Sequence, residues 1–157
     1  MEITRHFTAT AFIVHKGKVL LHLHKKLECW LPIGGHIDRD ELPEIAVTRE
    51  AVEETGLKIR LYRPDKSLKF GADAIDLHRP MHLLLENINK FHQHIDFIYF
   101  ATSKTDKLMP QNGETKNLKW FKESELSKLK NTPGNVVVLA KQALETEKYV
   151  AKRPLQK

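Results

Sequence analysis

The chain has 157 residues, of which 41% are hydrophobic and 29% are charged, so its composition is that of a folded globular protein and excludes an intrinsically disordered one. The formal net charge is +6, but the lysines are scattered along the chain, which indicates solubility rather than a nucleic-acid-binding module. A chain of this length can bury a proper core, and we expect a single domain over residues 1–157.

Cys29 is the only cysteine, which excludes an intrachain disulfide framework and a zinc site built from cysteines. The first residues lack the separate basic, apolar and cleavage regions of a signal peptide, and no apolar run approaches the length of a transmembrane helix. We therefore expect a cytoplasmic protein with no membrane partner. The oligomeric state stays open, with a homodimer among the possibilities.

A hairpin is predicted at the N-terminus, over Phe7–Leu23. Residues 7–15 are rich in β-formers and run into a Lys-Gly-Lys turn, after which residues 19–24 form the second strand. His22 and His24 share one face of that second strand, because alternate residues of a strand point the same way. They are candidate metal ligands, but we favour the simpler interpretation that they are the solvated or cleft-lining face of an edge strand.

An acidic helix is predicted between Pro43 and Gly56. Proline is suited to the first turn of a helix, and glycine is suited to the position just past its end. At about 100° per residue, Glu50, Glu53 and Glu54 fall on one arc of this helix. Like charges at these spacings repel each other by roughly 0.2–0.5 kcal/mol per pair in an exposed helix, so the cluster favours a compensating hard cation.

Around this helix, eight residues occupy a fixed pattern: Gly35, Glu41, Arg49, Glu50, Glu53, Glu54, Gly56 and Leu57. The pattern resembles the signature of the Nudix hydrolase family at every fixed position. Two neighbouring positions differ from the common form, since Ala51 is a small aliphatic residue and Leu42 stands where a capping Ser or Thr is common. Neither difference removes a charged group.

The resemblance implies a fold, a reaction and a cofactor. The fold is α/β, the Nudix-type α/β/α sandwich with a mixed β-sheet between helices. The reaction is metal-dependent hydrolysis of a phosphoanhydride bond in a nucleoside diphosphate linked to another moiety, so the partner is a small nucleotide substrate. The implied cofactor is Mg²⁺ or Mn²⁺, which neutralises phosphate charge and activates water.

The resemblance also implies roles for single residues. Glu53 and Glu54 are the principal metal ligands, and Glu50 is a further ligand or the general base. Arg49 holds Glu50 or the loop residue Glu41, a task that suits the rigid fork of a guanidinium group. The expected catalytic residues are therefore Glu50, Arg49 and Glu53.

Three glycines have implied structural or metal-binding roles. Gly34 precedes the motif and is the candidate for a backbone carbonyl that reaches the cation, because glycine lets the main chain approach closely. Gly35 and Gly56 are expected to shape the loops on either side of the helix, together with Glu41.

Further strands are predicted after the acidic helix, at residues 57–62, 81–88, 91–101 and 117–121, with residues 86–90 as a hairpin connection. Residues 68–75 are ambiguous. A small helix is predicted at residues 123–129, and Pro133 begins a last amphipathic helix that runs to about residue 150 and forms a packing layer.

Five residues outside the motif are weaker site candidates. His92, His94 and Asp96 share one strand face, which either lines the substrate cleft or binds a second cation, or is simply the outward polar face of a half-buried strand. Glu114 lies six positions before Trp120, where a number of Nudix hydrolases carry a further metal ligand or base. Trp30 is a candidate for stacking on a base or sugar, with packing as the alternative.

Two other functions fit a chain with this motif. A non-catalytic nucleotide-binding or sensing domain would keep the fold, but a degenerate motif would favour it and this motif is intact. An isopentenyl-diphosphate isomerase would need a catalytic cysteine in a characteristic apolar context, which the surroundings of Cys29 do not provide. No signature in the sequence identifies the particular nucleotide substrate.

Overall fold

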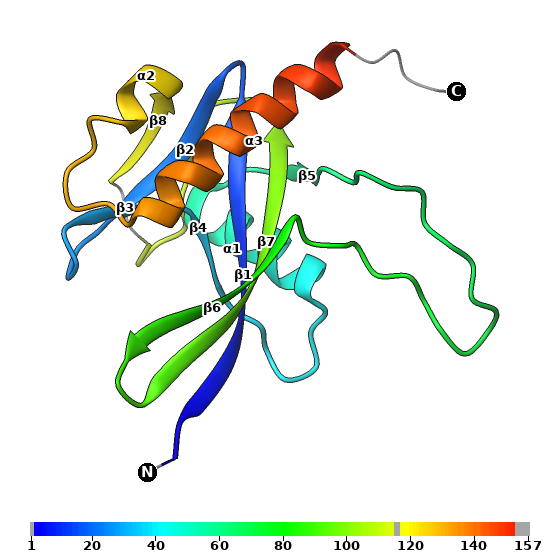
Figure 1. Ribbon diagram of the computed structural model, residues 1–157. Helices are drawn as coiled ribbons and strands as arrows, with labels where there is room; N and C mark the ends of the chain where they lie inside the picture. The colour runs from blue at the N-terminus through cyan, green and yellow to red at the C-terminus, as the bar shows by residue number, and fades with distance from the viewer. Residues whose placement is uncertain (1, 115–116, 153–157) are drawn as a thin grey trace.

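The structure is a computed structural model that describes residues 2–114 and 117–152. Its elements are β1 (Thr4–His15), β2 (Lys18–His24), β3 (Cys29–Leu31), β4 (Ile33–His36), α1 (Pro43–Thr55), β5 (Ile59–Leu61), β6 (His82–Asn89), β7 (His92–Ser103), β8 (Leu118–Lys122), α2 (Glu123–Leu126) and α3 (Gly134–Lys152). The strands form an eight-stranded mixed sheet (Figure 1). None of the described helices is long and apolar enough to cross a membrane.

Two long strands form the middle of the sheet. β1 pairs with β7 in parallel from Thr4–His92 to Val14–Thr102, the one parallel pairing among the described strands. On its other edge β1 pairs first with β4 and then with β2, both antiparallel. β7 likewise divides its outer edge between β6 and β5, and β2 carries β3 and β8. The predicted N-terminal hairpin is therefore confirmed.

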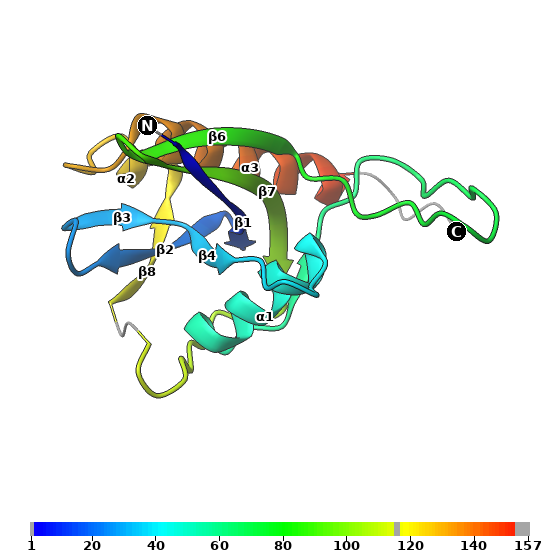
Figure 2. The same cartoon turned by 90° about the horizontal axis from the view of Figure 1, so that it is seen from below.

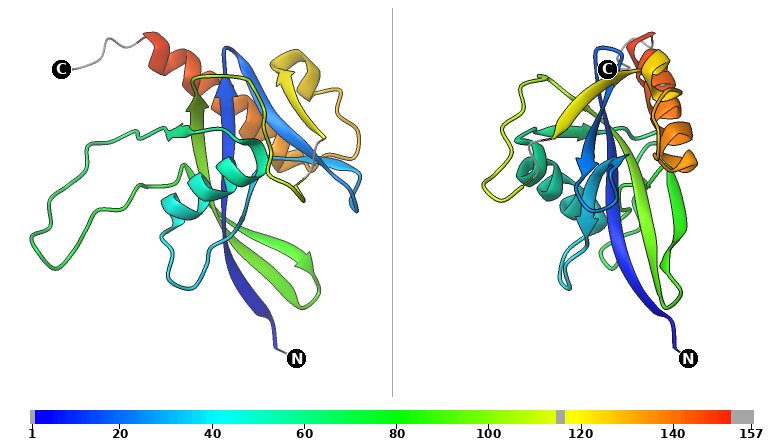
Figure 3. Two further views of the ribbon diagram at one scale, coloured as in Figure 1. Left: turned by 180° about the vertical axis from the view of Figure 1, so that it is seen from behind. Right: turned by 90° about the vertical axis from the view of Figure 1, so that its left-hand side faces the viewer.

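Helices cover both faces of the sheet (Figures 2 and 3). α1 lies on one face, while α2 and α3 lie on the other. Successive residues of a strand point to opposite faces, so β1 contributes to two separate cores. The core on the α1 side includes Ala9, Ala11, Ile13, Ala46, Val47 and Ala51. The core on the α3 side includes Phe12, Val14, Phe100, Val136, Ala140 and Leu144.

The acidic helix has the predicted ends. α1 begins at Pro43, and Gly56 follows its last residue in the left-handed conformation, with φ of 75° and its N–H bonded to Val52. Glycine adopts this conformation without the steric cost of a Cβ atom. Leu42 precedes the helix and offers no side-chain cap, as its identity predicts.

Some connections differ from the prediction. Residues 29–31 and 33–36 form the short strands β3 and β4, which we did not predict; β3 pairs with β2 just before it in the chain, and β4 pairs with β1. Residues 86–89 belong to β6 rather than to a hairpin connection, since pairing with β7 continues to Asn89 past a register shift. The ambiguous residues 68–75 lie in a long loop that projects from the sheet (Figure 1).

Candidate functional site

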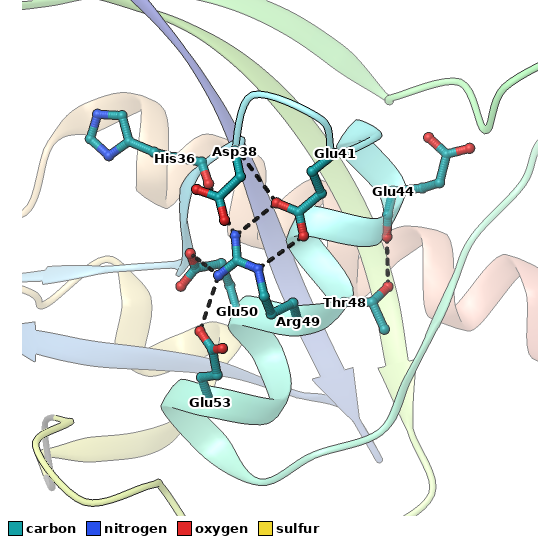
Figure 4. A network of polar contacts seen from close by, with 8 residues as sticks. All are labelled: His36, Asp38, Glu41, Glu44, Thr48, Arg49, Glu50 and Glu53. Carbon is teal, nitrogen blue, oxygen red and sulfur yellow. Dashed lines mark hydrogen bonds and ion pairs between the residues drawn. The ribbon is translucent and has the colours of Figure 1, made fainter.

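Arg49, in the middle of α1, contacts carboxylates from the helix and from the loop before it (Figure 4). Its Nε and Nη2 atoms donate to the two carboxylate oxygens of Glu41, each at 2.9 Å. Its Nη1 atom donates to Glu50 at 2.8 Å and to Glu53 at 3.0 Å. One guanidinium group therefore contacts three carboxylates, and the five donors of its planar fork make this geometry possible.

The contact with Glu41 closes the loop between β4 and α1. Hydrogen bonds from Arg49 hold the pKa of the Glu41 carboxyl below its usual value, and Glu41 in turn holds the pKa of Arg49 above its usual value. Glu41 also accepts the backbone N–H of Asp38 at 3.2 Å, and Arg49 donates to the backbone carbonyl of His36 at 3.2 Å. The loop is therefore tied to the helix at both of its ends.

Glu54 has a different environment from the other three glutamates. Its carboxylate accepts the backbone N–H of Gly34 at 3.0 Å. Burial is the largest cause that raises the pKa of Glu54 to about 7, and the negative charges of Glu50, Glu114 and Glu53 raise it further. A partly buried carboxylate with a raised pKa, surrounded by other carboxylates, is a place where a divalent cation is favoured.

The structure brings Glu114 close to Glu54, as their electrostatic interaction shows. Both glutamates line a pocket of about 290 Å³ between β2 and the loop before β8. His22 and His24 line the same pocket, so the cleft-lining part of the prediction is supported, but β2 pairs with β1, β3 and β8 and is not the edge strand that we expected. Burial lowers the pKa of His22 to about 4, so this ring is uncharged at neutral pH, and the positive charges that line the pocket are those of Lys25 and Lys26.

The two glycines before α1 are placed where a side chain does not fit. A Cβ atom on Gly35 would overlap the Glu50 carboxylate, and one on Gly34 would overlap the backbone of Ala9 in β1. The main chain therefore passes directly beside Glu50 and Glu54. Carboxylate oxygens next to main chain that carries no side chain suit a hard cation such as Mg²⁺ or Mn²⁺.

The weaker candidates Trp30, His92, His94 and Asp96 do not lie with the carboxylates of the motif. Trp30 packs edge-on against Phe121, with ring centroids 4.8 Å apart, so its contacts are those of a packing residue. Asp96 is buried, which raises the pKa of its carboxyl, and it accepts the Thr10 hydroxyl at 2.8 Å. His92 and His94 lie on the same face but gather with two other residues.

Those two residues are His6 and His36, and both were missed in the sequence. His6, His36, His92 and His94 place one ring nitrogen each within 4.8 Å of one another. The alternation in β1 was visible, but the parallel pairing of β1 with β7 that brings His6 beside His94 was not. The pattern at His92, His94 and Asp96 was the one local signal for this cluster.

Comparison with known proteins identifies the family. The NUDIX domain model matches residues 4–142, which include the whole motif and the carboxylates described above. The chain belongs to the Nudix family. The α/β fold with a mixed sheet that the motif implied is thereby confirmed, and Nudix hydrolases generally require a divalent metal ion and act on small nucleotide substrates.

Solved structures support the same assignment. A NUDIX-family hydrolase from Clostridium perfringens is 42% identical, with a TM-score of 0.81, and the match covers 92% of this chain and 99% of that chain. A UDP-X diphosphatase is 19% identical, with a TM-score of 0.64, over 94% of this chain and 66% of that chain. The NUDIX domain of Shewanella oneidensis NrtR complexed with ADP ribose is 21% identical, with a TM-score of 0.64, over 92% and 89%. The last two show likeness of fold alone.

Proposed function

We propose that this Nudix protein is a metal-dependent nucleotide pyrophosphohydrolase, which cleaves the phosphoanhydride bond of a nucleoside diphosphate linked to another moiety. The observation that carries the proposal is Glu54, a partly buried carboxylate that accepts the Gly34 N–H and lines a pocket with Glu114, and whose pKa is raised to about 7. A UDP-X diphosphatase and a domain complexed with ADP ribose share this fold, and both names denote nucleoside diphosphate derivatives, so the proposed substrate class is one that the fold accommodates.

The metal ligands in this proposal are Glu50, Glu53, Glu54, Glu114 and the backbone carbonyl of Gly34. All are hard oxygen donors, which suit Mg²⁺ or Mn²⁺. The bound cation supplies neutralisation of phosphate charge and activation of a water molecule.

Arg49 positions two of these glutamates. Its Nη1 atom donates to both Glu50 and Glu53, so it fixes their carboxylates while leaving their remaining oxygens able to accept. Glu50 acts either as a further ligand or as the general base, because Arg49 holds one of its carboxylate oxygens and leaves the other able to accept. Glu41 positions Arg49 and does not itself contact substrate.

Turnover of the Glu54→Gln variant tests the proposal. Glutamine keeps the shape of the side chain and removes its charge, so we expect metal-dependent turnover to fall at least about tenfold. A panel of ADP-ribose, UDP-sugars, dinucleoside polyphosphates and nucleoside triphosphates is assayed by phosphate release, each with Mg²⁺ and with Mn²⁺. Alkaline phosphatase releases phosphate from the products of the first three classes, and inorganic pyrophosphatase is used for the triphosphates, because alkaline phosphatase would attack those substrates directly.

Glu44→Gln is the matched control. Glu44 lies in the first turn of the same helix, points away from the Arg49 guanidinium (Figure 4), and its loss removes the same charge. We expect this variant to keep wild-type turnover. Equal turnover of wild type and Glu54→Gln contradicts the role of Glu54, and nucleotide binding without hydrolysis of any substrate contradicts the proposed reaction.

A further inference from the structure

We propose that His6, His36, His92 and His94 form a second metal site, which binds a divalent transition-metal cation of the Zn²⁺ class. This second site does not depend on the proposed function, because none of its four ligands belongs to the carboxylate site. The argument rests on the position of the rings, on their unpartnered nitrogens and on their donor chemistry.

The rings converge. One nitrogen of each histidine lies within 4.8 Å of the others. The ring centroids of His6 and His92 are 4.7 Å apart, those of His92 and His94 are 4.8 Å apart, and those of His36 and His94 are 5.1 Å apart. Tetrahedral zinc with bonds of about 2.0–2.1 Å requires its ligand nitrogens to lie about 3.4 Å apart. Side-chain rotations that move the ring nitrogens by about 1 Å are therefore enough to complete the site.

Three paired strands hold the four residues. His6 in β1 lies directly opposite His94 in β7, and two residues earlier in the same register His92 lies opposite Thr4. β4 pairs with the other edge of β1, where His36 lies opposite Thr8. Because alternate residues of a strand point to the same face, all four rings emerge on one face from a rigid scaffold rather than from a loop.

Two of the rings have a buried nitrogen without a partner. The Nε2 atoms of His92 and His94 are buried and make no hydrogen bond within the described part of the chain. Buried polar atoms are normally satisfied, so such atoms require an explanation, of which an ion is one. His6 and His36 are exposed, which leaves the site open to a cation from solution.

The donor chemistry separates this site from the carboxylate site. Imidazole nitrogens suit Zn²⁺, Cu²⁺ and Ni²⁺, whereas carboxylate and carbonyl oxygens suit Mg²⁺ and Mn²⁺. Asp96 lies on the same face of β7 but its carboxylate accepts the Thr10 hydroxyl, so the converging ligands are all nitrogens.

His36 connects the two sites through the backbone. Its carbonyl accepts a hydrogen bond from Arg49 at 3.2 Å, while its ring points away from that guanidinium (Figure 4). A cation bound by the ring therefore ties the start of the β4–α1 loop to β1 and β7. We expect occupancy to raise the melting temperature of the protein, because a ligand that binds only the folded state stabilises it.

Direct binding of Zn²⁺ alone tests the proposal. Chelator-treated full-length protein is titrated with Zn²⁺ by calorimetry, and the bound equivalents are counted after dialysis. Wild type and the Glu53→Gln/Glu54→Gln double variant are expected to bind one tight equivalent, which the His6→Gln/His36→Gln variant loses. Co²⁺ gives a second readout, since its visible absorption reports tetrahedral coordination by nitrogen and is expected to vanish in the same variant.

The controls keep the experiment decisive. His22→Gln/His24→Gln removes another pair of neighbouring histidines and should retain the tight equivalent. His6 and His36 are exposed, so their replacement leaves the core untouched, and His92→Gln/His94→Gln is expected to give the same loss. The proposal is overturned by unchanged binding in both histidine-cluster variants, by equal loss in the His22/His24 control, or by loss only in the glutamate variant.

Discussion

The carboxylates of the acidic helix fall into two groups. Glu41, Glu50 and Glu53 each form an ion pair with Arg49, at 2.9, 2.8 and 3.0 Å, so one guanidinium group offsets part of their negative charge. Glu54 accepts a hydrogen bond from the main chain instead, and burial makes its charged form costly. Of these glutamates, Glu54 is therefore the one whose charged form a divalent cation would stabilise most.

The raised pKa of Glu54 predicts a pH dependence of stability. The pKa is raised from 4.5 to about 7, so between these values the folded protein binds more protons than the unfolded chain. Without a divalent cation, the free energy of unfolding should therefore fall as pH rises through this window, by about 3 kcal/mol from this group. Urea unfolding in the presence of a chelator, at pH values below and above the window, measures the change.

The Glu54→Gln variant isolates this contribution from those of other titrating groups. Glutamine does not titrate, so the difference in unfolding free energy between wild type and variant should itself change with pH. We expect the variant to be the more stable of the two at the alkaline end. Parallel pH profiles of the two proteins would refute the assignment of the raised pKa to Glu54.

At the scale of elements, the junction between β4 and α1 controls where the Glu50 carboxylate lies. A Cβ atom on Gly35 would overlap that carboxylate, which is the far end of a flexible side chain and can move aside. We therefore predict that Gly35→Ala keeps the fold but displaces Glu50, and that turnover falls roughly a hundredfold, as small misplacements of catalytic groups do. Melting temperature and steady-state kinetics are measured on the same preparation.

Gly134→Ala is the control for this prediction. Gly134 is the first residue of α3, and a Cβ atom there meets nothing within 4 Å. Its replacement should leave turnover unchanged and should not lower stability, since alanine favours a helix. If Gly35→Ala retains full turnover, Glu50 does not need its observed position.

The same scale shows why some elements were predictable and others were not. The limits of α1 follow from Pro43 and Gly56, which act locally, so they could be read from the sequence. β3 and β4 are only three and four residues long and exist because β2 and β1 pair with them. Such pairing leaves little trace in a short segment, and it was missed for this reason.

The residues of the candidate sites likewise differ in how far the sequence could predict them. The motif predicted the residues around Arg49 because their spacing is set by one helix and one loop. The histidine cluster required His6 and His94 to become neighbours across the parallel pairing of β1 and β7. His6 and His94 are far apart in the sequence, and no periodic pattern indicates that they pair, so this contact could be found only from the structure.

On the scale of the whole molecule, the sheet lies between the candidate site on one face and the hydrophobic core under α3 on the other. The carboxylates belong to α1 and its flanking loops on one face, whereas α3 packs on the other face through a separate core. The strands between them are buried on both faces, so they are held independently of the residues in the site. Loss of packing under α3 should therefore weaken the fold without changing the geometry around Arg49.

Leu144→Ala tests this separation. Leu144 is 1% exposed in the core beneath α3, and its truncation should lower the free energy of unfolding by about 2–5 kcal/mol through lost burial and a residual cavity. Val138 lies on the same helix but is 64% exposed, so Val138→Ala should change stability by less than about 0.5 kcal/mol. Below the unfolding transition, kcat and KM of both variants should equal those of wild type, because neither residue lies on the face that carries the carboxylates. A fall in kcat for folded Leu144→Ala, with Val138→Ala unaffected, would instead mean that packing under α3 determines the positions of the glutamates through the sheet.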